Sequence, residues 1–288
     1  MKRTIMIAVA GLVALGGCSN KQRIQTEKEV AKALISDEQE AQLGLQVKQE
    51  LQKQNIKYLT DPTVTTYVEG MTKRIFPLAE KDRKDIQWHV HVVDDPKVVN
   101  AFATPGGHLY VYSGLLMEAE NEAEVAGVLS HEAGHVVGRH SARQMVNAFG
   151  LNAVASLALG ENPGLLQQLA TQIVGTGTML AYSRGAENEA DVYGVKYAAA
   201  AGYDPKGIAT FFQKLKAKEG KTPQYMTWLR THPATADRIK NINAYIAKHK
   251  LKGGETDAAG HMLVVNHLKT LTGAPVTAQP DGHTDHTH

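Results

Sequence analysis

Cysteine is almost absent from this chain, since Cys18 is the single one among 288 residues. One cysteine permits no intramolecular disulfide. Neither sign of charge is in excess, because 31 Lys and Arg residues stand against 29 Asp and Glu residues. Proteins that bind nucleic acid usually carry a basic face, so this balance argues against a nucleic-acid partner.

Long apolar runs are scarce as well. The run over residues 5–15 is shorter than the roughly 20 residues that a membrane-spanning helix needs. It follows Met1-Lys2-Arg3 and ends in small residues, which is typical of a secretory signal. Leu15-Gly16-Gly17-Cys18 resembles a bacterial lipobox, in which the cysteine is lipidated. We therefore predict a signal peptide over 1–17, then a lipidated Cys18 and tether over 18–35.

The lipobox resemblance also implies a compartment. Ser19 after the cysteine favours sorting to the outer membrane, so we expect a periplasmic bacterial protein anchored on the inner face of that membrane. Several acyl chains on one cysteine anchor stably, whereas one chain binds only marginally. A lipidated Cys18 leaves no thiolate to bind a metal or to act as a nucleophile. Loss of Lys2 and Arg3 with the signal leaves 29 residues of each charge.

The most informative local pattern is His131-Glu132-Ala133-Gly134-His135, which matches H-E-x-x-H. It lies in an apolar stretch that predicts a buried helix from about Asn121 to Phe149. Two His four residues apart are about 40° apart around a helix, so both imidazoles point the same way. A Glu beside the first His can take a proton from water at the metal. The pattern predicts a zinc hydrolase; the alternative is a surface helix with two solvated His.

Two patterns compete to supply the third zinc ligand. The metzincin motif continues H-E-x-x-H with a Gly and then a His, and Gly138 is correctly placed for it. However, its His position is Ser141, and the nearest histidine, His140, comes one residue early. In a continuous helix His140 would point about 180° from His131. We therefore reject this motif and predict that His140 lies on the helix surface or behind the ligands.

The other candidates are carboxylates downstream. Glu187 and Asp191 are spaced i, i+4 and share one helical face, whereas Glu189 is about 200° from Glu187 and faces away. One of the pair can bind the metal, and the other can accept the ring N–H of a ligating His. An exposed acidic helix start explains the same spacing. From spacing alone both interpretations stay open.

These motifs together resemble a known family. His131-Glu132-x-x-His135, Ser183-Arg184-x-x-Glu187-x-x-x-Asp191 and Thr231-His232-Pro233 are similar to the gluzincin metallopeptidases that include the CAAX prenyl protease, HtpX and mitochondrial OMA. The resemblance covers roughly residues 36–248. The lipobox makes the periplasmic lipoprotein-type members, LoiP, YcaL and BepA, the most similar branch.

The resemblance implies the roles of single residues. His131, His135 and Glu187 would bind one Zn²⁺ per chain, with Glu132 as general base and Asp191 behind a ligating His. Asn100, Ala101, Phe102 and Ala103 would form an edge strand beside the active-site helix, to which an extended substrate adds. His232 resembles a loop His that approaches the metal or the oxyanion, although Thr-His-Pro is also an ordinary helix start. Arg238 would support that helix or loop, in a structural or a catalytic role.

We expect an α+β fold, a mainly helical zincin-like domain with a small β-sheet beside the H-E-x-x-H helix. The domain would span 36–250, followed by a partly disordered extension over 251–288 with a His-rich tail. Capping signals predict helices from Ser36 and Asp61, residues 86–92 predict a strand, and residues 100–112 predict a hairpin. Further helices are expected from near residue 165, over about 182–200, over about 208–215, and from 231. His89 and His91 share one strand face and are expected to be solvated rather than metal-bound.

The function that follows is zinc-dependent cleavage of peptide bonds in misfolded or misassembled envelope proteins. The alternative is a chaperone or assembly factor for outer-membrane proteins with a latent zinc site. Hydrolysis of non-peptide amides has no positive support in the sequence.

Overall fold

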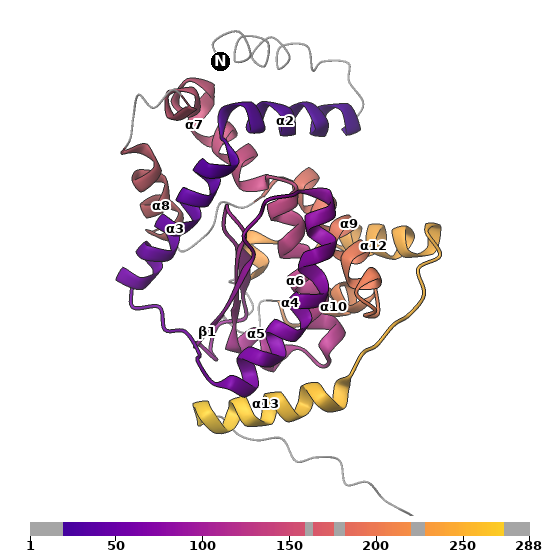
Figure 1. The fold of residues 1–288 in the computed structure, drawn as a ribbon. Coiled ribbons are helices and arrows are strands. Elements are labelled where there is room, and N and C mark those ends of the chain that lie inside the picture. The colour runs from indigo at the N-terminus through magenta and orange to yellow at the C-terminus, as the bar shows by residue number, and fades with distance from the viewer. Residues whose placement is uncertain (1–19, 159–163, 176–181, 220–227, 274–288) are drawn as a thin grey trace, which may run out of the picture.

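The protein is mainly helical, with one small sheet packed against its central helix (Figure 1). The computed structural model describes residues 20–158, 164–175, 182–219 and 228–273. The predicted signal peptide, Cys18 and the His-rich tail lie outside these ranges. The predicted α+β class is confirmed. In chain order the elements are α2 (Asn20–Leu34), α3 (Asp37–Lys53), α4 (Pro62–Asp82), β1 (His89–Val93), β2 (Ala101–Ala103), β3 (His108–Tyr112), α5 (Ser113–Glu118), α6 (Glu122–Val137), α7 (His140–Ala158), α8 (Leu165–Gly175), α9 (Arg184–Ala200), α10 (Gly207–Lys218), α12 (Ala236–Lys248) and α13 (Ala258–Thr272).

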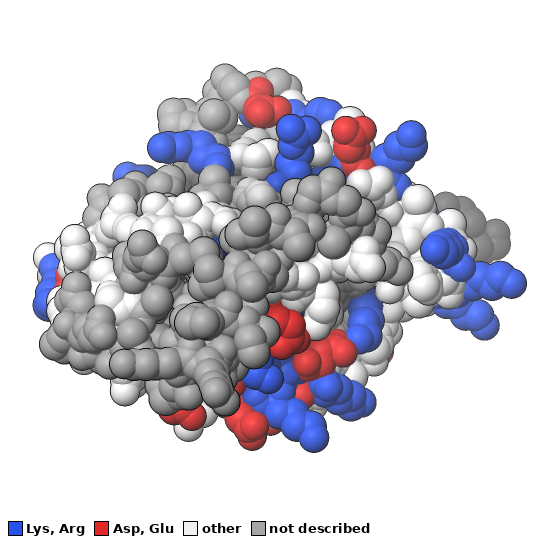
Figure 2. All heavy atoms as spheres, turned by 90° about the horizontal axis from the view of Figure 1, so that it is seen from above, with Lys and Arg blue, Asp and Glu red and all other residues white. Residues whose placement is uncertain are grey.

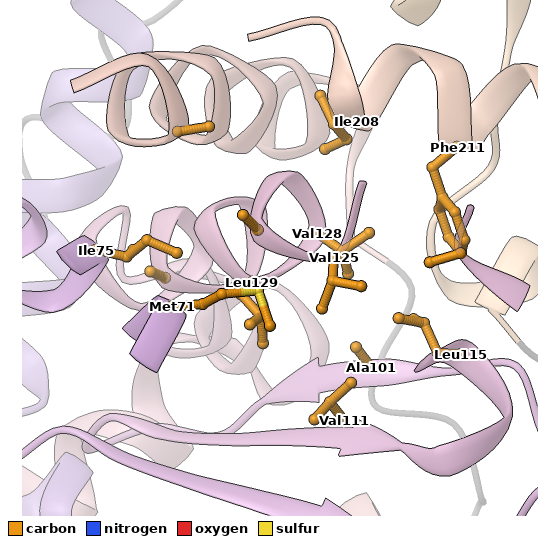
Figure 3. Close-up of a cluster of buried hydrophobic side chains, with 14 of the residues drawn as sticks. Met71, Ile75, Ala101, Val111, Leu115, Val125, Val128, Leu129, Ile208 and Phe211 are labelled. Atoms are coloured by element: carbon orange, nitrogen blue, oxygen red, sulfur yellow. The ribbon is translucent and has the colours of Figure 1, made fainter. Parts of the chain in front are cut away.

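Helix α6 carries H-E-x-x-H and is the centre of the core. Asn121 caps it by accepting a hydrogen bond from the Glu124 amide at 3.0 Å, and the residues from Ala123 to Val137 are all buried. Elements on three sides cover this apolar helix, as Figure 3 shows. The contacting residues are Val125, Val128 and Leu129 of α6, Met71 and Ile75 of α4, Ile208 and Phe211 of α10, Ala101 and Val111 of the sheet, and Leu115 of α5.

The predicted continuation of this helix to Phe149 is wrong. Helix α6 ends at Val137, and Gly138 is its C-cap. Arg139 then takes a left-handed conformation, with φ of 53°, before α7 begins at His140. A left-handed residue ends a right-handed helix, because the chain direction changes there. His140 is therefore not on the far side of a continuous helix.

The sheet has the order β1-β3-β2, which leaves β2 at an edge beside α6. Strand β1 runs parallel to β3, and β2 is antiparallel to it with Phe102 opposite Tyr110. The predicted hairpin is confirmed: Gly106 and Gly107 turn the chain with φ values of 82° and 95°, which glycine adopts without steric cost. The short edge strand therefore lies where an extended segment could pair with it.

Of the three described helices that precede the sheet, the first two, α2 and α3, bear on the predicted N-terminal boundaries. The capping box predicted at Ser36 is present, since Ser36 and Gln39 exchange side-chain and backbone hydrogen bonds at the start of α3. Residues 20–34, which the sequence predicts as part of a tether, form helix α2. Its sequence is largely polar, but Val30, Ala31 and Leu34 are buried where α2 packs on α7.

Of the two C-terminal helices, α12 packs beside α9 and α10, and α13 lies at the end of the molecule opposite α2 (Figure 1). Helix α12 begins at Ala236 with Thr235 as its N-cap, and not at Thr231 as predicted, because the residue before Pro233 is disfavoured in a helix. Helix α13, within the predicted extension, packs on α4 and α5. Tyr67 and His261 join it to α4 through a 2.7 Å hydrogen bond.

Charged side chains of both signs are interspersed on the face that Figure 2 shows. This agrees with the nearly even totals of acidic and basic residues in the sequence. Within the described ranges, none of the helices has the length and apolar character needed to cross a membrane.

Candidate metal centre

Glycines let α6 and α9 approach closely enough to share one site. A Cβ atom at Gly134 would lie 2.8 Å from the Cβ atom of Tyr193, and one at Gly194 would lie 3.2 Å from the backbone of His131. Carbon atoms prefer separations of about 3.5–4.0 Å, so larger residues would push the helices apart. Ser183 caps α9, and its first turn places Glu187 opposite the two His of α6.

The site brings together His131, His135, Glu187 and His232, all of them buried. The Nε2 atoms of His131 and His135 are 3.0 Å apart, and each lies 3.6 Å from an oxygen of Glu187. Zinc with bonds of about 2.0–2.2 Å in a tetrahedron separates its ligand atoms by roughly 3.3–3.6 Å. Nitrogen and carboxylate donors at these separations fit a zinc ion, so the group could bind one.

Asp191 and Arg238 lie behind these ligands. The Nδ1 atom of His131 is 3.0 Å from Asp191, which leaves its Nε2 atom for the metal. Arg238 donates through Nε and Nη2 to Asp191, at 2.8 and 2.6 Å, and its Nη1 atom is 2.7 Å from Glu187. Burial alone would raise the pKa of Asp191, but Arg238 lowers it below its usual value. Asp191 is thus held as a carboxylate facing His131.

Glu132 lies on the cavity side of the same helix turn. Burial raises the pKa of its carboxyl group. Its Oε1 atom has no hydrogen-bond partner among the described residues and is 3.6 Å from Nε2 of His232. A buried polar atom without a partner calls for an explanation. A water molecule bound between Glu132 and the metal ligands would be that partner. Glu132 would then have the position of a general base.

His232 closes the donor set from the loop before α12. Its Nδ1 atom is 3.1 Å from Glu187 and 3.5 Å from Nε2 of His131. Burial alone would lower its pKa, but the carboxylates of Glu187 and Glu132 raise it. The imidazole therefore lies where a fourth ligand or a hydrogen-bond donor to the reacting group would lie.

A cavity of about 140 Å³ opens beside Glu132 and His232. Strand β2 and helices α3 and α8 form its walls, and most of its lining is apolar. The lining residues are Val47, Leu51, Gln54, Ile56, Asn100, Phe102, Ala103, Tyr112, Glu132, Ile173, Val174, Tyr182, Thr231 and His232. Asn100, Phe102 and Ala103, which were expected to face the substrate, are thus at the cavity, whereas Ala101 is buried in the core.

Three contacts at the site were not predicted from the sequence, although one of the two positions expected for His140, behind the ligands, is confirmed. Tyr182 stacks on His135 with ring centroids 4.1 Å apart, although it comes before the recognised motif. His140 contacts His135, because the chain turns at Arg139. Glu189 faces away from the ligands, as expected, but it contacts His140 at 3.2 Å. Motif spacing carries no signal for such contacts, since they depend on the turn and on the neighbouring helices.

A buried H-E-x-x-H helix joined by a carboxylate from a second helix defines a zincin-type metallopeptidase. Comparison with known families gives the particular assignment: residues 62–246 match the model of peptidase family M48. The chain belongs to this family. The resemblance stated from the motifs is therefore confirmed, and so is the prediction of an enzyme of the metalloendopeptidase class.

Proteins similar to this chain include both mitochondrial and bacterial metalloproteases. The chain is 33% identical over 193 residues to the mitochondrial metalloendopeptidase OMA1 of Schizosaccharomyces pombe, which covers 67% of this chain and 56% of that protein. It is 31% identical over 261 residues to the metalloprotease LoiP of Escherichia coli, covering 87% of this chain and 99% of LoiP. It is 29% identical over 223 residues to the beta-barrel assembly-enhancing protease of the same organism, covering 73% and 44%. The chain thus spans about half of OMA1 and nearly all of LoiP.

Proposed function

We propose that this protein is a zinc-dependent metalloendopeptidase, anchored to the bacterial envelope, that cleaves misfolded or misassembled envelope proteins. The carrying observation is the donor set of His131, His135 and Glu187 beside a buried Glu132 that faces a cavity. The names of two bacterial relatives support the envelope role, since one is a metalloprotease and the other a protease that enhances beta-barrel assembly.

The residues divide the work of peptide hydrolysis. When bound, zinc would polarise the scissile carbonyl group and make water more acidic. Glu132 takes the proton of the attacking water and delivers it to the leaving amine, and its raised pKa suits both transfers. Asp191 and Arg238 keep His131 and Glu187 in place. His232 is close enough to Glu132 to donate to the developing oxyanion once it leaves Glu187.

Strand β2 would hold the substrate. Asn100 and Thr104 exchange backbone hydrogen bonds with β3. Because alternate residues of a strand point their backbone groups to opposite sides, those of Ala101 and Ala103 point away from β3. The Ala103 amide is directed at Glu132. An extended peptide added along this edge would place its backbone next to the general base, which fits loose sequence preference.

Zinc content and cleavage of an unfolded protein, measured together, test this function. Wild type should contain about one zinc per chain and lose activity to a chelator. Glu132→Gln should keep zinc and lose cleavage by a factor of at least about 10². Glu122→Gln, on the first turn of the same helix and outside the site, is the matched control and should stay active. Full activity of Glu132→Gln would remove Glu132 as the base.

The envelope anchor has its own test. Radiolabelled palmitate should enter the wild type and not Cys18→Ala, and fractionation should place the wild type with the outer membrane. Label on the Cys18→Ala variant, or wild type in the soluble fraction, would contradict lipidation at Cys18.

The second candidate is a chaperone or assembly factor with a latent zinc site. It is favoured by His232, whose Nδ1 atom occupies the fourth position of the donor set. If His232 acts as a latch, His232→Ala should raise cleavage, and if it stabilises the oxyanion, the same variant should lower it. In cells that lack the protein, rescue of the envelope defect by Glu132→Gln would favour the chaperone.

A further inference from the structure

His135 has a buried partner of its own behind it. The Nδ1 atom of His140 lies 2.8 Å from Nδ1 of His135, and its Nε2 atom lies 3.2 Å from Oε2 of Glu189. His140 and His135 are 1% and 2% exposed. The three side chains therefore form a hydrogen-bonded row that begins at a carboxylate and ends at a residue of the donor set.

The direction of donation along this row follows from the carboxylate. Lys28 and Arg143 both form ion pairs with Glu189, so two cations face this side chain and hold it as a carboxylate. An ionised carboxylate only accepts, so Nε2 of His140 carries the proton. Nδ1 of His140 then accepts, and Nδ1 of His135 donates. This leaves the lone pair of His135 on Nε2, the atom that faces His131 and Glu187.

Helix α2 holds the far end of the row. Lys28 forms an ion pair with Glu189. Arg143 donates to Glu189 at 2.8 Å and to Glu27 of α2 at 2.7 Å. The side chain of Glu189 is 12% exposed, so these partners share a largely desolvated site, where ion pairs are screened little.

The turn that places His140 is held by the same region. Arg139, whose left-handed backbone ends the active-site helix, donates to the carbonyl oxygen of Ile35 at 2.7 Å. Its Nη1 atom is 2.7 Å from Asp37. Ile35 and Asp37 join α2 to α3, so the N-terminal helices support the turn as well as the row.

We propose that His140, Glu189 and Lys28 are positioning residues that fix the tautomer and the ring orientation of His135, which makes helix α2 part of the metal centre. This inference rests on the proposed zinc site. The other histidine of the site, His131, is positioned in the same way by one residue, because its Nδ1 atom is directly 3.0 Å from Asp191. Partners of this kind behind a ligand change metal affinity by about 10–100-fold when they are lost.

Zinc affinity of the full mature chain, measured by competition with a chromophoric chelator, tests the proposal. His140→Phe keeps an aromatic ring and removes both nitrogens, and it should weaken zinc binding about 10–100-fold. Lys28→Met, which acts on the row only through Glu189, should weaken zinc binding by a measurable but smaller factor than His140→Phe. Lys32→Met, on an exposed position of the same helix, is the matched control and should leave affinity unchanged.

A second readout separates positioning from general stability. In metal-free protein labelled with ¹⁵N-histidine, the imidazole spectrum of wild type should show His135 protonated at Nδ1. In His140→Phe, and in Glu189→Ala, that tautomer preference should be lost even where circular dichroism shows an intact fold.

The outcomes distinguish this inference from the proposed function. A wild type that binds no zinc contradicts the proposed function itself. The positioning role alone is overturned if wild type binds zinc and both Lys28→Met and Glu189→Ala bind it with the wild-type affinity and keep the wild-type tautomer of His135. The Lys28 variant keeps the test decisive if His140→Phe fails to fold.

Discussion

Removal of Arg238 should expose how strongly the metal centre depends on one buried cation. The Arg238 side chain is 6% exposed and contacts both Asp191 and Glu187, whose side chains are 4% and 2% exposed. Arg238→Met removes the guanidinium group, which lies over the Phe212 ring with Cζ 4.5 Å from its centroid, and two buried carboxylates lose their partner. Breaking a buried ion pair on one side costs about 3–5 kcal/mol. In metal-free protein the melting temperature should therefore fall by roughly 6–20 °C.

Zinc should reduce this loss, because the metal compensates the charge of Glu187 in place of Arg238. Urea unfolding in chelator and in zinc, for wild type and Arg238→Met, measures the difference directly. Adding Asp191→Asn to Arg238→Met should recover part of the stability in chelator. Lys196→Met, which breaks an exposed pair with Asp82, is the control and should cost about 1 kcal/mol or less. A loss below about 1 kcal/mol for Arg238→Met in chelator would refute the reasoning.

Two further predictions concern the helices around the site. The pKa of Glu189 is lowered to about 2, so its stabilising effect is complete above its unfolded pKa of roughly 4.5 and is lost as the pH falls toward 2. In chelator, the free energy of unfolding of wild type should exceed that of Glu189→Gln by at most about 3 kcal/mol at pH 7, and the difference should vanish near pH 2. A difference that does not change with pH would contradict this. Gly134→Ala should cost about 1–3 kcal/mol and weaken zinc binding, because its Cβ would lie 3.0 Å from the carbonyl oxygen of Ala190. Gly70→Ala, in open space on α4, should be neutral or stabilising by up to about 1 kcal/mol, and equal effects of the two glycine changes would be evidence against a close helix crossing.

Local signals predicted the helix starts well. Ser36 and Asn121 accept hydrogen bonds from backbone amides three residues ahead, and such caps depend on short-range chemistry that a sequence displays directly. The i, i+4 spacing of Glu187 and Asp191 predicted one shared face, and in the structure both contact His131. Periodicity sufficed there because α9 is regular throughout.

What could not be predicted depends on contacts between distant segments. The residues next to Arg139 do not predict its left-handed conformation. The turn is stabilised by contacts of the Arg139 side chain with Ile35 and Asp37, which are about a hundred positions earlier in the chain. Helix α2 has too few apolar residues to be stable alone, and it is stabilised by packing on α7. Because this turn was not predicted, the sequence left His140 either on the helix surface or behind the ligands, and the structure shows the second position. The angle around a helix has meaning only while the helix continues.

The position of α2 has a geometric consequence for where the enzyme works. Asn20, the first residue of α2, is two positions after Cys18, and a fully extended chain covers at most about 3.6 Å per residue. If Cys18 carries the anchor, the start of α2 lies within about 7 Å of the lipidated residue. The catalytic domain would then lie against the bilayer, with no long flexible linker between it and the lipid anchor. Its substrates would be polypeptides close to the membrane surface. Which polypeptides are cleaved would depend first on their distance from the bilayer, and only then on the side chains next to the scissile bond.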